Sequence, residues 1–595
     1  MYTLSTQENR FQLQVQHSHP AVGGLLRLFR GSVERALAFP QLNEINAAAE
    51  CRQEEYSAED RILRAMRVGL DVDGGALERI PDTGPLIVVA NHPFGGVEGL
   101  LLASLLHRRR TDVRIMANRM LGHIPSLRDL FILVNPFGGE LAVRSNSAPL
   151  KEALRWLGEG GVLGVFPAGE VSHADVRRGE ISDPAWSDTI ARIAMHSGAA
   201  VLPIFIEGCN GPLFQLMGLL HPRLRTARLP HEFVNKCDST VTMRIGHVIS
   251  PTRIRQFKTS GDLIAYLRIR TYLQRSGSTP APLMRSEPLP EAVVDAADKV
   301  LLRHEISALP ESALLVQHER FGVYIADARD IPVVLREIGR LREITFRANN
   351  EGTGRSIDLD RYDAWYLHLF LWDETAGEIA AAYRLGPTDV ILREHGKKGL
   401  YTHSLFNIRK KLLKQISPAL EMGRSFVRQE YQKQFLPLLL LWRGIGTYVR
   451  RNPRYTRLFG PVSINSAYSA VSQKLMMEFL KEHAMDERAH LVRPKTPPNA
   501  ERLRGFDPRT MSTVLRDLSD LSSLVSEIEQ DQKDVPILLK QYLKLGGVLL
   551  GFNIDPDFSN VLDGLILVDL TKTDRRMLER YMGAEGADAF LRHCQ

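Results

Sequence analysis

The first half of the chain alternates between short apolar runs and longer segments with apolar residues at helical spacing. The runs are rich in Val, Ile and Leu, so they predict buried strands at residues 85–90, 162–166 and 201–206. Helices are predicted between them at residues 97–107, 147–157 and 184–195. If the strands are parallel, this order predicts an α/β sheet whose strands end along one edge, where such folds bind ligands.

The first predicted strand is followed by residues suited to acid–base chemistry. His92 follows the strand, and Gly95 and Gly96 turn the chain before Glu98 opens the next helix. A neutral histidine can take the proton of a hydroxyl that attacks a thioester, typically worth about 10² to 10⁴ in rate, and a carboxylate can orient it. We predict that His92 is a general base and that Glu98 orients it. The alternative is a strand-end histidine beside a favourable first-turn acid.

Polar residues also follow the other two strands. Gly169 and Glu170 follow the second strand, and Glu207 follows the third. Together the motifs NHPFGGVEG, FPAGEVS and VLPIFIEG resemble those of the glycerolipid and lysophospholipid acyltransferases, over residues 77–256. The resemblance implies that Asn91, Gly169, Glu170 and Glu207 surround the acceptor next to His92 and Glu98.

Two departures from that family's motifs bear on the acceptor. The acid lies six residues after the histidine, and Val97 stands where the usual aspartate would be. Val171 replaces the arginine that helps to hold the acceptor's phosphate in the family. Both departures favour an acceptor without that phosphate, and they resemble the hemolysin-like, or ornithine-lipid-type, acyltransferases.

A Ser- and Pro-rich stretch, residues 276–290, breaks all periodicity and predicts a linker. Beyond it, a strand at 321–328 precedes a helix that Asp330 is expected to cap. The remaining elements of this segment are predicted as strands at 364–372, 378–385 and 425–427, a helix at 438–449 and a strand at 458–464. This order resembles the GNAT acyltransferases, which bind a pantetheine thioester where two central strands splay apart.

A scattered charged set in this segment resembles that of ornithine-lipid N-acyltransferases and acyl-homoserine-lactone synthases. Its members are Arg342, Phe346, Asp363, Arg384, Glu421 and Arg424. Both families transfer an acyl group from acyl carrier protein to an amine. Carboxylates would attract the ammonium of an amino acid and an arginine would bind its carboxylate. A buried ion-pair network that only orders the sheet is the alternative. The base of this step stays open between Asp363, His368, Glu421 and a water molecule.

The acyl donor is expected to be acyl carrier protein, with coenzyme A as the second possibility, and no bound cofactor is expected. The glycine-rich pyrophosphate loop of coenzyme-A-using GNAT enzymes is replaced by residues 428–434, RQEYQKQ. Basic residues at 409–414 and 450–457 are candidate docking patches for the acidic carrier, or ordinary solvated faces.

Composition narrows the partners further. The chain has 595 residues and 76 basic against 69 acidic side chains, a mild excess without nucleic-acid-binding motifs, so no nucleic acid partner is expected. Its four cysteines lie far apart and predict neither a disulfide framework nor a metal site. Without a signal peptide or spanning segment, we expect a peripheral protein on the cytoplasmic side of the inner membrane. Residues 25–42 could form an interfacial membrane helix or a helix docked on its own domain.

We therefore predict an α/β chain with an N-terminal mixed sheet covered by helices on both faces, a second GNAT-like α/β domain and a small C-terminal extension. The expected segments are a helical region (1–60), an O-acyltransferase domain (61–275), a linker (276–310), a GNAT-like domain (311–490) and the extension (491–595), whose sequence carries no chemical motif.

The two resemblances together are similar to the bifunctional ornithine lipid synthases. They imply N-acylation of ornithine, or a similar amino acid, with a 3-hydroxyacyl group from acyl carrier protein, followed by O-acylation of the resulting lyso-aminolipid at a membrane surface. The alternatives are a lysolipid O-acyltransferase with a carrier-binding GNAT-like domain, or a lipid synthase for glycine or another amino acid. A pore-forming protein lacks a matching sequence pattern, and an autoinducer synthase leaves NHPFGGVEG without a role.

Overall fold

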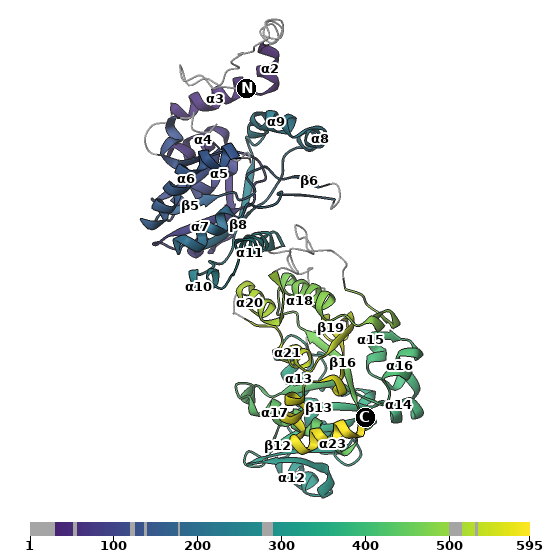
Figure 1. Ribbon diagram of the computed structural model, residues 1–595. Coiled ribbons are helices and arrows are strands. Elements are labelled where there is room, and N and C mark those ends of the chain that lie inside the picture. The colour runs from purple at the N-terminus through teal and green to yellow at the C-terminus, as the bar shows by residue number, and fades with distance from the viewer. Residues whose placement is uncertain are drawn as a thin grey trace. The chain divides into compact units, whose positions relative to one another are not determined.

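The computed structural model describes residues 30–51, 56–118, 125–135, 140–175, 179–276, 290–498, 514–529 and 533–594. The described residues form two compact units. The N-terminal unit lies within residues 1–279 and includes residue 514, and the C-terminal unit lies within residues 280–502 and 515–595 (Figure 1).

The N-terminal unit contains a seven-stranded sheet in the order β1-β9-β8-β2-β5-β3-β4. The strands are β1 (Gly69–Val72), β2 (Leu86–Ala90), β3 (Val113–Asn118), β4 (Phe131–Val134), β5 (Val162–Val165), β8 (Ala200–Ile206) and β9 (Thr240–Ile245). The pair β8 and β9 is antiparallel and the other pairs are parallel, so the sheet is mixed, as predicted. All five residues of β2 are buried although successive side chains point to opposite faces, so both faces of the sheet are covered there.

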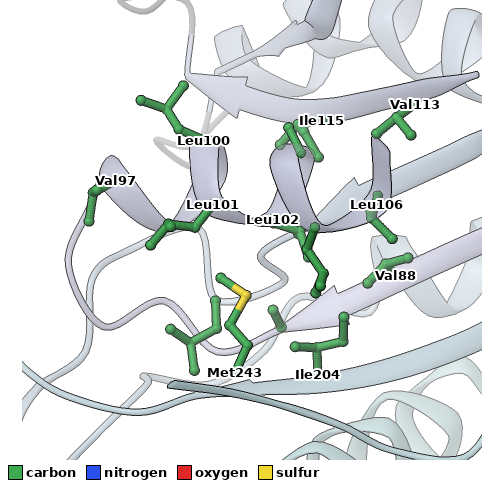
Figure 2. Close-up of a cluster of buried hydrophobic side chains, with 14 of the residues drawn as sticks. Val88, Val97, Leu100, Leu101, Leu102, Leu106, Val113, Ile115, Ile204 and Met243 are labelled. Atoms are coloured by element: carbon green, nitrogen blue, oxygen red, sulfur yellow. The ribbon is translucent and has the colours of Figure 1, made fainter. Parts of the chain in front are cut away.

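Helices surround this sheet, and one of them fixes the position of the predicted base. Helix α5 (Val97–His107) has the bounds that its apolar spacing predicts, and its leucines pack on Val88, Ile115, Ile204 and Met243 (Figure 2). The other helices of the unit are α2 (Arg30–Ala36), α3 (Phe39–Glu50), α4 (Ala58–Met66), α6 (Glu140–Gly158), α7 (Thr189–Ser197), α8 (Pro212–Leu220), α9 (Pro222–Val234), α10 (Pro251–Ile254) and α11 (Ser260–Leu273). The short strands β6 (His173–Asp175) and β7 (Glu180–Ser182) form a separate hairpin.

The C-terminal unit is built on an eight-stranded sheet in the order β10-β11-β12-β13-β15-β16-β19-β18. Its strands are β10 (Leu314–His318), β11 (Phe321–Asp327), β12 (Leu367–Asp373), β13 (Glu378–Pro387), β15 (Ala419–Val427), β16 (Arg457–Ile464), β18 (Val548–Asp555) and β19 (Val561–Asp569). The helices are α12 (Lys299–Ser307), α13 (Pro332–Ala348), α14 (Thr388–Glu394), α15 (Thr402–Leu405), α16 (Lys410–Ile416), α17 (Leu436–Arg451), α18 (Ala470–His483), α20 (Leu518–Ile528), α21 (Ile537–Lys544), α22 (Arg575–Met582) and α23 (Ala584–Cys594).

The two central parallel strands of this sheet separate partway along their length. Strands β15 and β16 pair from Ala419 with Arg457 to Glu421 with Phe459, but β15 continues to Val427 and β16 to Ile464. Strand β16 stays paired with β19 throughout. The sheet therefore opens between β15 and β16, as the resemblance to the GNAT acyltransferases implies.

Several expected boundaries differ in the structure. Helix α13 begins after Ile331, and the carboxylate of Glu305 accepts the N–H groups of Val333 and Val334 in its first turn, so Asp330 is not its cap. The expected linker, 276–310, includes helix α12, whose apolar side chains join a core with α13. The expected C-terminal extension supplies β18 and β19 to the main sheet, because both strands carry apolar side chains that are buried there, and β19 is buried along almost its whole length.

The amphipathic segment 25–42 lies partly outside the described residues. From Arg30 it forms α2 and the start of α3, where Phe39 and Leu42 pack against Phe233 and Val234 of α9. This contact agrees with the second of the two alternatives for this segment, a helix docked on its own domain. None of the helices in the described parts of the chain is both long and apolar enough to cross a membrane.

A glycine at the opening between β15 and β16 provides a test of the sheet. A Cβ added at Gly460 would lie 2.0 Å from the carbonyl oxygen of Met422, so Gly460→Ala must push the strands apart. We expect a loss of about 3 kcal/mol in the free energy of unfolding, measured by chemical denaturation of the full chain. Gly423→Ala on the neighbouring strand is the control, because a Cβ there meets no atom within 4 Å. Equal stability of the two variants would contradict the strand packing described here.

Candidate functional site

His92 and Glu98 lie together at the end of β2. Nδ1 of His92 is 2.8 Å from Oε1 of Glu98, and the imidazole stacks on Phe166 with ring centroids 4.7 Å apart. Nδ1 of His92 is buried, and it has no other hydrogen-bond partner among the described residues. The side chain of His92 is 18% exposed and that of Glu98 is fully buried. The structure thus brings the predicted base and its partner together.

Glu98 is held by the backbone of the glycine turn before its own helix. Its Oε1 accepts hydrogen bonds from the N–H groups of Phe94 (2.9 Å) and Gly95 (2.6 Å), and its Oε2 accepts one from Gly96 (2.8 Å). Gly95 has a φ of +96°, and a Cβ there would lie 2.6 Å from Leu229 of α9. The turn therefore requires glycine at this position, and it points three donors at one carboxylate.

The pair shifts both pKa values in opposite directions. Burial raises the pKa of Glu98, but the charge and hydrogen bond of His92 and the N–H groups of Gly95 and Gly96 outweigh it, so the pKa is lowered to about 2. Burial lowers the pKa of His92, but Glu98 and, after it, Asp183 outweigh that effect and leave the pKa raised. Glu98 is therefore ionised at neutral pH, and it stabilises the imidazolium that forms when His92 takes a proton.

Asp183 anchors the loop that carries His92, and sequence reasoning missed it. Its Oδ1 accepts the backbone N–H of His92 (3.1 Å) and the hydroxyl of Ser172, and its Oδ2 accepts Nε1–H of Trp186 (2.8 Å). The N–H of Ser172 also donates to the carbonyl oxygen of His92. Asp183 thereby ties NHPFGGVEG to FPAGEVS. The only sequence signal was an acid next to Pro184 in an otherwise irregular stretch.

The other predicted residues of this edge are engaged with protein groups. Asn91 exchanges two hydrogen bonds with the backbone of Ile206, 2.9 and 2.7 Å, so its amide joins β2 to β8 and does not face an acceptor. Gly169 forms a turn at φ +65°.

Two predicted acceptor carboxylates are paired with arginines. Glu170 lies 2.8 Å from Arg225, and Glu207 lies 2.5 Å from Arg244. An acceptor's ammonium would have to compete with these arginines. The sequence could not reveal these pairs, because each arginine lies far from its partner along the chain.

A second polar cluster lies in the C-terminal unit, beside the opening between β15 and β16. Arg342 of α13 donates to Oδ1 of Asp363 at 2.8 Å, and Arg384 of β13 lies 3.2 Å from the same oxygen. Arg384 also donates to Asp360 at 2.7 Å. Burial raises the pKa of Asp363, but Arg342 and Arg384 hold it well below its usual range. Three of the predicted residues therefore form one buried ion-pair network.

Arg424 joins this network from a bulge in β15. It has a φ of +49°, a conformation that non-glycine residues rarely adopt, and it lies 3.7 Å from Asp358 and 3.8 Å from Asp360. The rings of Tyr401 and Phe558 lie against its guanidinium group. The bulge comes three residues after β15 stops pairing with β16. Arg424 is therefore held at the opening of the sheet.

The three arginines keep buried donors without partners. Among the described residues, Nε and Nη2 of Arg342, the same atoms of Arg384, and Nε of Arg424 make no hydrogen bond. Buried donors left unpaired cost free energy, and they mark a place where a carboxylate or carbonyl oxygen would bind.

The open candidates for the base of the second site differ in their environment. Asp363 is neutralised by two arginines, which makes it a poor base. Burial lowers the pKa of His368 to about 4. Burial raises the pKa of Glu421, although it accepts hydrogen bonds from the hydroxyl of Tyr366 and the N–H of Thr402. Glu421 thus reaches the network through Tyr366, whose ring lies against the guanidinium group of Arg384, and it forms no ion pair with any described residue.

The C-terminal strands add carboxyl groups that sequence reasoning missed. Asp555 of β18 accepts from the hydroxyl of Tyr401 at 3.2 Å, and Asp563 of β19 accepts from Ser463 of β16 at 3.0 Å. Burial raises the pKa of Asp563 to about 8, with Asp555 and Glu351 adding to the shift, and burial raises that of Glu351 to about 7. The run DPDFSNVLD, which places three acids around one turn, was the available signal. Acidic groups thus exceed arginines around Arg424.

Comparisons with known families match both units. A family described as Acyltransferase matches residues 54–279, and a family described as Acetyltransferase (GNAT) domain matches residues 341–442. A glycine N(alpha)-acyltransferase of Bacteroides thetaiotaomicron is 32% identical over 302 residues, which are 48% of this chain and 89% of that protein. The chain belongs to the family of this acyltransferase.

Two further proteins match parts of this chain. A lyso-glycine lipid O-acyltransferase of Phocaeicola vulgatus is 26% identical over 203 residues, 33% of this chain and 70% of that protein. The crystal structure of the 1-acyl-sn-glycerophosphate (LPA) acyltransferase PlsC from Thermotoga maritima aligns with a TM-score of 0.24 and 19% identity, over 42% of this chain and 92% of that one. At this TM-score the likeness says nothing more about the fold.

The acyltransferase therefore has two chemically distinct polar sites. The first offers a buried carboxylate–imidazole pair suited to deprotonating a hydroxyl. The second offers arginine donors and surplus carboxyl groups, which suit a ligand that carries both a carboxylate and an ammonium.

Glu98→Gln tests the first site. The change removes the negative charge beside His92 and leaves one loop N–H facing an amide N–H, so we expect O-acyl transfer to fall about 10² to 10⁴-fold. In the native chain the rate should rise with pH through the raised pKa of His92. In the variant that pKa falls, and the acidic limb of the profile moves to lower pH. The pH dependence of the rate measures both effects.

The matched control is Glu59→Gln. Glu59 lies 2.5 Å from Nδ1 of His107, at the other end of α5. The substitution therefore removes a second histidine–carboxylate pair that involves the same helix. We expect native rates for this control. An equal loss in both variants would assign the effect to folding and contradict a catalytic role for Glu98.

Asp563→Asn tests whether the carboxyl group of Asp563 in the second site has a raised pKa. Because the pKa of Asp563 is raised to about 8 from an unfolded value near 4, the native state binds the extra proton, and stability falls as pH rises through that window. Asparagine does not titrate, so the variant lacks this fall in stability with pH, and its side-chain oxygen can still accept the hydrogen bond of Ser463. We expect the free energy of unfolding to fall less between pH 5 and 9 in the variant, measured by chemical denaturation. The exposed Asp557, changed to Asn, is the control, and equal pH dependence of Asp563→Asn and the native chain would disprove the shift.

Proposed function

We propose that this acyltransferase makes a two-chain aminolipid in two steps, one in each unit. The C-terminal unit attaches a 3-hydroxyacyl group to the α-amine of an amino acid, and the N-terminal unit then acylates the 3-hydroxyl of that product. The observation that carries the proposal is the presence of two separate polar sites, one suited to a zwitterion and one to a hydroxyl, in units that match two acyltransferase families.

In the first step, the arginines at the opening of the sheet bind the acceptor's carboxylate. The unpaired donors of Arg342, Arg384 and Arg424 support this role. The amine, once deprotonated, attacks the thioester carbonyl carbon. The new N–C bond forms, the C–S bond breaks and the carrier leaves as a thiol. The thioester lies in the gap between β15 and β16, where backbone groups of the separated strands can bind its carbonyl oxygen.

The acceptor is ornithine or a similar diamino acid. Among the described residues, Glu351, Asp555 and Asp563 form no ion pair, and Arg424 offsets the effect of burial only in part. The raised pKa values of all three favour a ligand that brings a second ammonium group. Glycine is the second candidate, because relatives of this chain are named glycine N(alpha)-acyltransferase and lyso-glycine lipid O-acyltransferase.

In the second step, His92 takes the proton of the 3-hydroxyl as that oxygen attacks a second thioester. The proton then passes from the imidazolium to the leaving thiolate, and Glu98 stabilises the charged intermediate state of the ring. The loss of the phosphate-binding arginine at Val171 supports an acceptor without a phosphate. Acyl carrier protein is the proposed donor for the first step, with basic residues 409–414 and 450–457 as docking patches.

A single-function lysolipid O-acyltransferase with a carrier-binding C-terminal unit is the competing account. It predicts that loss of His92 abolishes all acyl transfer. In the two-step account the N-acyl product still forms and accumulates.

Lipid analysis of a host without aminolipids separates these accounts. The intact chain should yield a phosphorus-free diacyl aminolipid, and His92→Ala should yield only the monoacyl precursor, both detected by mass spectrometry of extracts. The head-group mass identifies ornithine or glycine. His196→Ala is the control, because His196 is an exposed histidine of α7 in the same unit. An increase in lysophospholipid acylation without any aminolipid would overturn the two-step proposal.

A further inference from the structure

Helices α8 and α9 form a hairpin with an apolar outer face. Five leucines within residues 213–224 are each more than two-fifths exposed: Leu213 (48%), Leu216 (56%), Leu219 (55%), Leu220 (73%) and Leu224 (43%). On α8 they recur at helical spacing, and Phe214 on the other side of the helix is fully buried. A contiguous exposed apolar face of this kind marks an interaction surface.

The inner side of the same hairpin covers the loop that carries His92. Leu229 of α9 lies against Gly95, and Phe233 lies against Gly96. Arg225 of α9 pairs with Glu170, the residue after the turn at Gly169. One side of the hairpin thus contacts the first site, and the other side is exposed.

The charge of the hairpin indicates what kind of surface it meets. Residues 211–231 contain no aspartate or glutamate, but they contain Arg223, Arg225 and Arg228. The first acid, Glu232, is buried and paired with Arg228. Arg225 and Arg228 are already paired with Glu170 and Glu232, so the outer face is apolar and carries no acid. Such a face suits a helix that lies in the interface of a bilayer.

We propose that the α8–α9 hairpin docks the N-terminal unit on a lipid surface, with its five exposed leucines in the bilayer interface. The proposal rests on the proposed function in one respect, since the acceptor of the first site is then a lipid that resides in that bilayer. Docking there brings the His92 loop next to the membrane from which the acceptor is drawn. Other occupants of this face, a second copy of the chain or another segment of it, are outcomes of the test.

Vesicle binding of the purified full chain tests the surface without any acyl donor. The triple variant Leu216→Ser, Leu219→Ser, Leu220→Ser should bind vesicles of phosphatidylglycerol and phosphatidylcholine at least ten-fold more weakly than the native chain in sedimentation. The matched control is Val300→Ser, Leu301→Ser, Ile537→Ser, which removes three exposed apolar side chains from the C-terminal unit and should bind as the native chain does. Circular dichroism and the melting temperature check that both variants fold.

A single substitution reports the contact directly. Leu220→Trp should shift its emission to shorter wavelength when anionic vesicles are added, and Val300→Trp should not. Unchanged vesicle binding of the triple leucine variant, or no emission shift at position 220, would overturn the proposal. So would a change from dimer to monomer in that variant without a change in vesicle binding, because it would assign the face to a second copy.

Activity separates this proposal from the proposed function. The triple leucine variant should lose O-acyl transfer to an acceptor embedded in vesicles by ten-fold or more and keep the native rate on a short-chain, water-soluble 3-hydroxyacyl amino acid. If the native chain acylates neither acceptor but still binds vesicles through the hairpin, the proposed function fails and the docking surface stands. Equal loss on both acceptors would contradict docking as the role of these leucines.

Discussion

The first site depends on one buried negative charge. A carboxylate without solvent is costly unless it is paired and hydrogen-bonded, and Glu98 is fully buried. Three loop N–H groups, the start of α5 and the imidazole of His92 together compensate its charge. The same contacts fix the turn, orient the ring and raise the pKa of His92. The arrangement at the end of β2 is thus one electrostatic unit, in which the loop conformation and the chemistry cannot be changed separately.

In the second site, by contrast, the buried charged groups are only partly compensated by one another. Arg342, Arg384 and Arg424 keep unpaired donors, while carboxyl groups on the C-terminal strands have raised pKa values. A network that served only to order the sheet would be expected to satisfy its own members. The strained backbone of Arg424 has the same implication, because it lies in a bulge at the strand opening, and such strain is concentrated at ligand sites. Both features are explained by a zwitterionic ligand that would complete the network.

The local pattern of apolar residues predicted the helix and strands that carry the first site. The remaining contacts of the site depend on pairs of residues that lie far apart in the sequence. Helix α5 and the parallel strands followed from apolar spacing, and the two glycines before Glu98 foretold the fold-back of its carboxylate. Asp183 was missed, because its role depends on a contact with His92 across 91 residues of sequence. The pairs of Glu170 with Arg225 and Glu207 with Arg244 were hidden for the same reason. In the C-terminal unit, five dispersed charges were identified, but the strands β18 and β19 that complete their surroundings carry no motif.

The two sites also impose an order on the proposed reactions. A free amino acid is fully polar and gains most from a buried network of fixed charges, which is the environment around Arg424. Its N-acyl product is an amphiphile, which partitions to lipid surfaces because its chain leaves water. The hydroxyl that the first site would deprotonate exists only on that product, and the first site lies beneath a hairpin with exposed leucines. In the proposed function, N-acylation therefore comes before O-acylation. The change of the proposed intermediate from a solute to a lipid would move it from one kind of site to the other. Joining both units in one chain keeps that intermediate at a high local concentration near the second catalyst.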